Sequence, residues 1–408
     1  MRWSNFFHIY QPPAWDEVII RRACTESYEP LVSVLRQHPE IKITLNITGA
    51  LIDQLSALGL GQVLTEVRQL AERGQIELVG SAKYHPILPL LPPEEVVRQI
   101  ELQEGVCRNV FGPVFAPQGF YAPEMAYSSS LEKLLLDRGY RWVILDEICS
   151  GQPLGAIRFN KRFVAPGGLG VIFRNRYLSD FLSFSATIDQ PEKSVAAIQQ
   201  DVRSVDGIVT AMDGENLGHH RAGVDRLWEI LVTWPEMETE TLSEYRRRLS
   251  AEEIIAPHDG SWSSQPQEML ANVPFGLWNH PENPIHKLQW QLTHQIIAAV
   301  RGATDDPTFD VARRLLDQAL TSDKYWWASA SPWWDMTIVI RETQRLVDVL
   351  SPLTRVQPKI MNTAERLMKQ VATTVELWEK TGLAKRRQAT YLHQTGDVRY
   401  MGGQRLVA

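Results

Sequence analysis

The chain has 408 residues and a formal charge of −6 at pH 7, from 42 Lys and Arg against 48 Asp and Glu. This length exceeds that at which single hydrophobic cores usually stop growing, so we expect one large domain with an appendage, or two domains. The mild acidity argues against nucleic-acid binding, which needs a basic surface. No apolar run approaches the ~20 residues that span a bilayer, and no signal-peptide pattern opens the chain. Because three scattered cysteines also fit a reducing compartment, we expect a cytoplasmic protein with neither nucleic acid nor membrane as partner.

Short apolar runs alternate with helical patterns through the first half of the chain. In chain order the patterns predict strand 3–9, helix 27–37, strand 41–47, helices 50–58 and 61–73, strand 76–79, helix 92–110, strand 116–121, helix 128–138, strands 142–145 and 171–174, helix 191–203 and strand 207–212. Such alternation implies a parallel sheet, and the number of units indicates a barrel or a large doubly wound sheet. No GxGxxG follows the first strand and no GxxxxGK[ST] occurs, so nucleotide-binding fingerprints are absent.

The pattern changes after about residue 255. Residues 256–284 are rich in Pro, Gly, Ser and Asn and are predicted to form a long loop. Helical periodicity then predicts helices at 285–302, 308–321, 336–350 and 355–382, followed by a loose tail over the last 20 residues. We therefore predict a β/α barrel domain over residues 1–260 and a loop and helical domain over residues 261–408.

Polar segments follow several of the predicted strands. They are residues 8–13, 84–86, 119–124 and 212–220, with a fifth polar and aromatic segment at 323–327 in the helical part. In parallel sheets and barrels the active site lies at the C-terminal ends of the strands. The sequence therefore predicts that side chains from these segments share a site.

Glu124 and Asp213 are each the first carboxylate beyond an apolar strand. Two facing carboxylates suit acetal hydrolysis, because one can protonate the leaving oxygen while the other attacks or stabilises the anomeric carbon. Each also has a simpler interpretation: Glu after Pro often occupies a first helical turn, and Asp-Gly is a common turn pair. Their joint position at strand ends favours the catalytic interpretation.

In sequence order the segments resemble the motifs of glycoside hydrolase family 57. The matching segments are His8-Ile9-Tyr10-Gln11-Pro12, Gly74–Gly80 with Pro86–Pro89 downstream, Tyr121-Ala122-Pro123-Glu124, Asp213–Gly218 and Asp323-Lys324-Tyr325-Trp326. The resemblance covers roughly residues 1–330. It implies an incomplete (β/α)7 barrel followed by a C-terminal helical region, and an enzyme among the retaining α-amylases, 4-α-glucanotransferases and branching enzymes.

The resemblance also implies roles for individual residues. Glu124 is then the nucleophile and Asp213 the acid/base, whose pKa must be raised by burial or by the negative charges of Glu124 and Glu215. The predicted substrate-binding residues are His8, Gln11, His85, Tyr121, Glu215, His220, Trp262, Asp323 and Trp326. The implied substrate is an α-linked oligo- or polysaccharide, with no cofactor and no metal, and residues 261–408 would contribute to its cleft.

Four residues depart from the family pattern: Tyr10 and Tyr121 replace a usual His and Trp, and His85 and His220 stand where Glu and an aromatic residue are common. They put a standard starch-type substrate in question. The sequence leaves two other functions open. The first is a metal-dependent deacetylase or hydrolase using His8, His85, Asp213, His219 and His220. The second is a non-catalytic carbohydrate-binding homologue.

Tryptophan is unusually frequent, and eight of the 13 lie beyond residue 260. Tryptophan side chains can stack on the flat apolar faces of sugar rings. We expect substrate stacking from Trp262, Trp278 and Trp290, and at least two core residues among Trp326, Trp327, Trp333 and Trp334.

Overall fold

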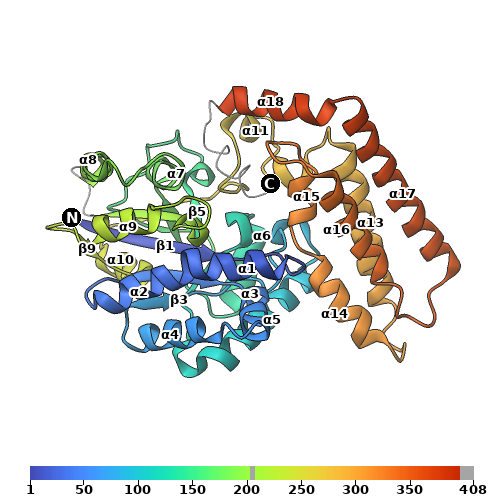
Figure 1. Ribbon diagram of the computed structural model, residues 1–408, viewed down its shortest axis with the longest axis horizontal. Helices are drawn as coiled ribbons and strands as arrows, with labels where there is room; N and C mark the ends of the chain where they lie inside the picture. Colours follow the sequence, from blue (N-terminus) through green and yellow to red (C-terminus); the bar gives the residue numbers. More distant parts are fainter. Residues whose placement is uncertain (203–206, 396–408) are drawn as a thin grey trace. The chain divides into compact units, whose positions relative to one another are not determined.

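The computed structural model describes residues 1–202 and 207–395, which form two compact units (Figure 1). Unit 1 contains residues 1–83 and 88–262. Unit 2 contains residues 84–87 and continues from residue 263. No helix in the described ranges combines the length and the apolar character needed to cross a membrane.

Seven strands of the described part of unit 1 form a parallel β system. They are β1 (Arg2–Ile9), β2 (Ile43–Ile47), β3 (Ile76–Leu78), β4 (Gly119–Phe120), β5 (Trp142–Asp146), β7 (Gly170–Arg174) and β8 (Ile208–Asp213). One run has the order β3-β2-β1-β8, and β4 pairs with β5, which pairs with β7. A parallel bridge between Gly80 and Phe120 connects the two runs beside β3 and β4. On the other side the Asn175 N–H donates to the Val209 carbonyl at 2.7 Å, so β7 lies beside β8 without a continuous ladder.

These strands form because their residues suit burial on both faces. All five residues of β2, Ile-Thr-Leu-Asn-Ile, are buried, as are the five of β5 and of β7. Near-continuous apolar runs of this kind are typical of parallel strands covered by helices. Three short strands extend the sheets: β6 (Arg162–Val164) antiparallel to β7, β9 (Glu238–Thr239) beside β1, and β10 (Glu252–Ile254) beside β6.

Helices follow the strands of unit 1. They are α1 (Glu17–Ala23), α2 (Glu29–Gln37), α3 (Gly49–Ala57), α4 (Gly61–Glu72), α5 (Pro93–Phe111), α6 (Ser130–Asp137), α7 (Arg176–Phe184), α8 (Pro191–Val202), α9 (Val224–Val232) and α10 (Leu242–Arg248). Shorter turns are η1 (Cys24–Tyr28), a π-helix, and the 3₁₀ turns η2 (Leu88–Leu90), η3 (Gly112–Val114), η4 (Pro123–Met125), η5 (Glu147–Ser150) and η6 (Gly214–Asn216). Gly74, just after the C-cap of α4, has a φ of +76°, a left-handed conformation that glycine adopts without steric strain.

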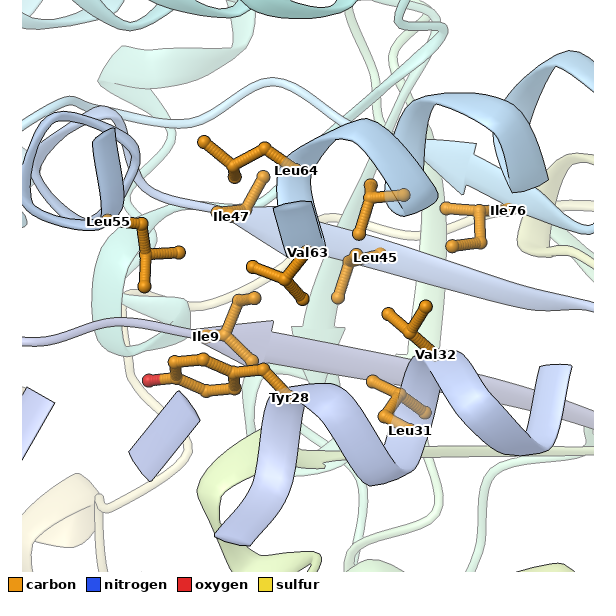
Figure 2. A pocket seen from close by; sticks show the side chains of 11 residues that line it. Ile9, Tyr28, Leu31, Val32, Leu45, Ile47, Leu55, Val63, Leu64 and Ile76 are labelled. Carbon is orange, nitrogen blue, oxygen red and sulfur yellow. The ribbon is translucent and has the colours of Figure 1, made fainter. Parts of the chain in front are cut away.

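Apolar side chains from the strands and helices make the core of unit 1. Ile9, Leu45, Ile47 and Ile76 from β1, β2 and β3 face residues of α2, α3 and α4 around a small cavity (Figure 2). The lining is apolar apart from Tyr28, whose hydroxyl donates to Glu215 at 2.5 Å. A cavity lined in this way offers no set of polar partners to a ligand, so it belongs to the packing of the core.

Unit 2 is helical. Its helices are α11 (Pro266–Leu270), α12 (Gly276–Asn279), α13 (Pro284–Arg301), α14 (Phe309–Ala319), α15 (Asp323–Trp327), α16 (Met336–Asp348), α17 (Pro358–Lys380) and α18 (Leu383–Thr395). The prediction of an uninterrupted loop over 256–284 is wrong, because α11 and α12 lie within it. Helices of four or five residues are too short to show periodicity. The predicted tail is wrong for residues 389–395, which belong to α18, and its residues 396–408 lie outside the described ranges, as does residue 203 of the predicted helix 191–203.

Candidate active site

Polar side chains gather at the carboxyl ends of β1, β2 and β8. In the strand register His8 of β1 pairs with Asn46 of β2 on one side and with Asp213 of β8 on the other. The His8 Nδ1 lies 2.7 Å from Asn46 Oδ1. Burial lowers the pKa of His8 to about 3, against the opposing effect of the Asn46 hydrogen bond. His8 is therefore a neutral imidazole at physiological pH.

Glu124 lies just beyond β4 in η4 and has a left-handed backbone conformation, with φ +60° and ψ 18°. That conformation costs a residue with a Cβ about 1 kcal/mol, and such strain is concentrated at functional sites. The Trp262 indole Nε1 donates to Glu124 Oε2 at 2.7 Å, and the Trp262 backbone N–H donates to the Glu124 carbonyl at 3.2 Å. The carboxylate is thus oriented by a residue 138 positions further along the chain. A hydrogen-bond donor also favours its charged form.

Asp213 ends β8 and begins η6. Its side chain makes no capping hydrogen bond to that turn. Burial raises the pKa of Asp213 to about 7, although the positive charge of Arg174 acts in the opposite direction. Asp213 can therefore carry a proton near neutral pH.

Asp213→Asn should stabilise the protein at neutral and higher pH. The folded-state pKa of about 7 lies above the ordinary value of 3.8, so the native protein binds more protons than the unfolded chain and loses stability between about pH 4 and 7. The Asn variant does not undergo this loss. Its excess unfolding free energy should grow across that window to on the order of 4 kcal/mol and stay constant above it. Denaturant unfolding at pH 4, 6 and 8 measures this.

Asp137→Asn is the matched control, because Asp137 is an exposed carboxylate of α6 in the same unit. It should show no such growth. If the stability difference between Asp213→Asn and wild type were the same at pH 4 and pH 8, Asp213 would have an ordinary pKa.

Tyr121 lies close enough to Glu124 and Asp213 for both charges to act on its phenol. Burial raises the pKa of its phenol, and the negative charges of Glu124 and Asp213 raise it further. Its ring centroid lies 4.5 Å from that of His8 and 5.8 Å from that of Trp262. The structure thus brings five predicted site residues together in unit 1: His8, Tyr121, Glu124, Asp213 and Trp262.

Glu215, two residues after Asp213, is hydrogen-bonded to Gln11. Glu215 Oε1 accepts hydrogen bonds from the Tyr10 N–H at 3.0 Å, from Gln11 Nε2 at 3.3 Å and from the Tyr28 hydroxyl at 2.5 Å. Burial and the nearby charge of Asp213 raise the pKa of Glu215 to about 8. Glu215 therefore ties the segment after β1 to the segment after β8. Sugar contact by Glu215 or Gln11 stays a prediction.

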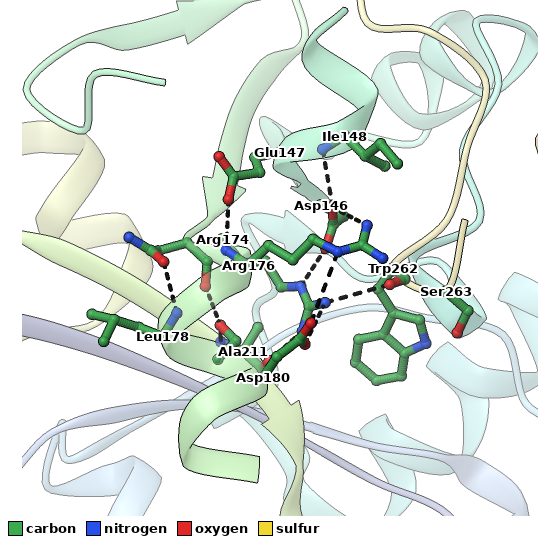
Figure 3. Close-up of polar contacts among 12 residues, drawn as sticks. Asp146, Glu147, Ile148, Arg174, Arg176, Leu178, Asp180, Ala211, Trp262 and Ser263 are labelled. Atoms are coloured by element: carbon green, nitrogen blue, oxygen red, sulfur yellow. Dashed lines mark hydrogen bonds and ion pairs between the residues drawn. The ribbon is translucent and has the colours of Figure 1, made fainter. Parts of the chain in front are cut away.

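Arg174 and Asp146 are site residues that the sequence prediction missed (Figure 3). Arg174 ends β7 and its Nε donates to Asp146 Oδ2 at 2.6 Å. Arg176 Nη1 binds the other Asp146 oxygen at 3.0 Å, and Arg174 Nη2 binds Asp180 at 3.2 Å. The signal that pointed to Asp213, a charged residue ending an apolar strand, also marks Asp146 and Arg174.

Of the histidines proposed for a metal site, His8 lies beside Asp213, whereas His219 and His220 have other partners. His219 Nδ1 lies 2.6 Å from Glu26 Oε2, and His220 is exposed, with its Nδ1 3.3 Å from Asn216 Oδ1. His85 belongs to unit 2. In the two described ranges no group of three or more His, Cys, Asp or Glu side chains could hold a metal ion. The described residues therefore offer no ligand set for the deacetylase hypothesis.

Three predicted site residues lie in unit 2. His85 has a φ of +56°, and its Nδ1 lies 3.0 Å from Ser322 Oγ. Asp323 follows Ser322 at the start of α15 and accepts a hydrogen bond from the Thr321 hydroxyl. Trp326 is partly exposed, with its ring centroid 5.4 Å from that of Trp333. Their roles stay predictions.

The tryptophans of unit 2 differ from the expectation. Trp278 and Trp290 are buried, and Trp290 stacks on Tyr325 with ring centroids 4.2 Å apart, so neither presents a free face for stacking on a sugar. Among Trp326, Trp327, Trp333 and Trp334 only Trp327 is buried. The expectation of two or more core residues in that set is wrong: Trp326, Trp327 and Trp333 pack on one another, but the rings of Trp326 and Trp333 stay partly exposed.

Comparison with known proteins agrees with the architecture. The alpha-amylase of Pyrococcus horikoshii is 28% identical over 209 residues, which cover 48% of this chain and 32% of the relative. The crystal structure of 4-alpha-glucanotransferase from Thermococcus litoralis superposes with a TM-score of 0.66 at 19% identity, covering 88% of this chain and 59% of that one. A GH57-type branching enzyme from Pyrococcus horikoshii superposes with a TM-score of 0.66 at 15% identity, covering 90% and 94%.

The chain matches only about a third of the length of that curated alpha-amylase. The superposed structures confirm the predicted fold class, an incomplete barrel followed by a helical region. The family model described as Glycosyl hydrolase family 57 matches residues 5–257, more than half of the chain. The chain therefore belongs to glycosyl hydrolase family 57.

Proposed function

We propose that the chain is a retaining glycosidase or transglycosidase of α-glucans, with Glu124 as nucleophile and Asp213 as acid/base. One observation carries the proposal: the two carboxylates near Tyr121 have different surroundings. The Trp262 indole donates to Glu124 at 2.7 Å, which favours a charged nucleophile, while burial raises the pKa of Asp213 to about 7, which favours a proton donor. Environments that separate the pKa values of two carboxyl groups define an acid and a nucleophile.

In the first step a Glu124 oxygen attacks the anomeric carbon of an α-linked sugar. The bond from that carbon to the leaving oxygen breaks, and the Asp213 proton passes to this oxygen. The product is a β-linked glycosyl ester of Glu124. Because Glu124 is then neutral, the loss of its charge lowers the pKa of Asp213, which becomes a base.

In the second step Asp213 removes a proton from water or from a sugar hydroxyl. That oxygen attacks the anomeric carbon, the ester bond breaks, and Glu124 regains its negative charge. Two inversions restore the α configuration. Water gives hydrolysis and a sugar hydroxyl gives transfer.

The substrate class is supported by the relatives, whose names include alpha-amylase and 4-alpha-glucanotransferase. The ring of Trp262 is partly exposed beside Glu124, so it can stack on the apolar face of a pyranose. We propose that Trp262 borders the sugar nearest Glu124, with the buried rings of His8 and Tyr121 packed against it, and that His220, exposed beyond β8, contacts a neighbouring sugar.

A product screen on maltooligosaccharides, glycogen and an aryl α-maltoside tests this function. We expect shorter products from hydrolysis or longer ones from transfer, with the α anomer appearing first in proton NMR of the fresh reaction. A first-formed β anomer would contradict double displacement. Calorimetric binding of oligosaccharides without turnover would identify a non-catalytic homologue.

A further inference from the structure

A single buried guanidinium, that of Arg174, contacts the supports of both carboxylates. We propose that Arg174 is the positioning residue of this site, holding Trp262 against Glu124 and the end of β8 beneath Asp213 with one rigid group. The inference rests on the proposed function. It goes beyond that function by assigning the alignment of the two carboxylates to a residue that contacts neither of them through a hydrogen bond.

Arg174 contacts Trp262 in two ways. Its Nη2 donates to the Trp262 carbonyl at 3.4 Å, and its guanidinium carbon lies 5.6 Å from the centroid of the indole ring (Figure 3). A carbonyl contact and a ring contact from one planar group restrict both the backbone and the ring of Trp262. The ring orientation then directs the indole N–H at Glu124 Oε2.

The other end of the guanidinium contacts β8. Arg174 Nη1 donates to the Ala211 carbonyl at 3.0 Å, two residues before Asp213. Ala211 also receives support from α7, because its N–H donates to Ser179 Oγ at 3.0 Å. Arg174 thus links β7 to β8 two residues before Asp213, and this link restricts the position of Asp213.

Arg174 is itself fixed. Its side chain is 5% exposed, Asp146 is fully buried, and the Nε–Oδ2 distance is 2.6 Å. Arg174 Nη2 also pairs with Asp180 at 3.2 Å, and Arg176 pairs with the second oxygen of Asp146 at 3.0 Å. Two arginines therefore form ion pairs with two aspartates. Lysine cannot reproduce this arrangement, because one ammonium group lacks the planar fork of donors.

The charge of Arg174 also acts on Asp213. The groups whose charges bear on this region are Arg174 from β7, Glu215 from η6, Glu124 from η4, the neutral phenol of Tyr121 after β4 and the neutral imidazole of His8 from β1. Arg174 is the cation in this set. Its removal should raise the pKa of Asp213, whereas lysine should preserve most of the charge.

The test compares Arg174→Lys and Arg174→Met with Arg313→Met. Arg313 is a matched control in unit 2, since it is buried on α14 and paired with Asp317 at 2.9 Å. On an aryl α-maltoside we expect kcat/KM to fall about 10-fold in Arg174→Lys and about 100-fold in Arg174→Met, as for other groups that orient catalytic residues. The alkaline limb of kcat/KM should move to higher pH in Arg174→Met and stay in place in Arg174→Lys.

A second measurement reports on geometry without turnover. The indole ¹H–¹⁵N resonance of Trp262, assigned by its loss in Trp262→Phe, should shift in both Arg174 variants and stay unchanged in Arg313→Met. Wild-type kcat/KM together with an unshifted resonance in folded Arg174→Lys would overturn the inference while leaving the function intact. If the Trp262 resonance shifts in the Arg174 variants but the wild-type protein does not turn over any α-glycoside, the proposed function alone is overturned.

If Arg174→Met does not fold, Arg174→Lys still decides between these outcomes. Its NMR resonance tests the contact with Trp262, and its reduced kcat/KM tests the alignment. An Arg174→Lys variant whose loss of activity equals that of Arg313→Met, with no resonance shift, would show a merely structural role.

Discussion

Glu124→Gly should lower kcat on an aryl α-maltoside by about 10⁴-fold or more, because no group then attacks the anomeric carbon. The left-handed backbone of Glu124, with φ +60°, suits glycine, so this variant should fold at least as well as the wild type. Added azide should restore turnover by occupying the space of the missing carboxylate. Since azide then makes the only displacement on an α-linked substrate, the product should be a β-glycosyl azide, which NMR identifies.

Glu124→Gln and Glu101→Gln form the matched comparison. Glutamine keeps the size of the side chain but lacks the nucleophilic charge, so Glu124→Gln should remain as inactive as Glu124→Gly without responding to azide. Glu101 is an exposed carboxylate of α5, and its variant should retain wild-type kcat. Substantial activity in Glu124→Gln, or an α-glycosyl azide from Glu124→Gly, would contradict the nucleophile assignment.

Asp213→Ala should affect substrates according to their leaving groups. A maltooligosaccharide needs its leaving oxygen protonated, so its turnover should fall by about 10²- to 10⁴-fold. Maltosyl fluoride needs little acid assistance, so formation of the glycosyl-enzyme should be nearly unaffected and deglycosylation should limit the rate. Azide needs no base. It should therefore accelerate this step and, by attacking the β-linked ester, give an α-glycosyl azide.

The pH profile provides an independent readout of the same residue. In the wild type the acid form of Asp213 is required in the first step, so kcat/KM for a maltooligosaccharide should fall as the pH rises above about 7. Asp213→Asn should lose this limb along with most of its activity, while the exposed Asp137→Asn should keep both. If the limb persisted in the residual activity of Asp213→Asn, the proton donor would be a different group.

The sequence predicts much of the barrel because parallel strands buried on both faces leave a strong pattern. The apolar runs of β1, β2, β5, β7 and β8 were located to within a residue or two of their observed ends. β4 was predicted over 116–121 but has only two paired residues, because strand pairing depends on a neighbour that the local pattern does not contain. Helices α11 and α12 were not predicted, because helices of four or five residues are too short to show helical periodicity.

Chain position marks Glu124 and Asp213 as carboxylates at the end of or just beyond a buried strand, although it marks Asp146 equally. Their chemical states were decided by the tertiary structure. The donor to Glu124 comes from Trp262, 138 residues away, and the pKa of Asp213 depends first on how deeply the packed elements bury it. Arg174 carries no local sign that it touches both supports. Hydrogen bonds and burial between distant segments are set by folding, so they become visible only when those segments are brought together.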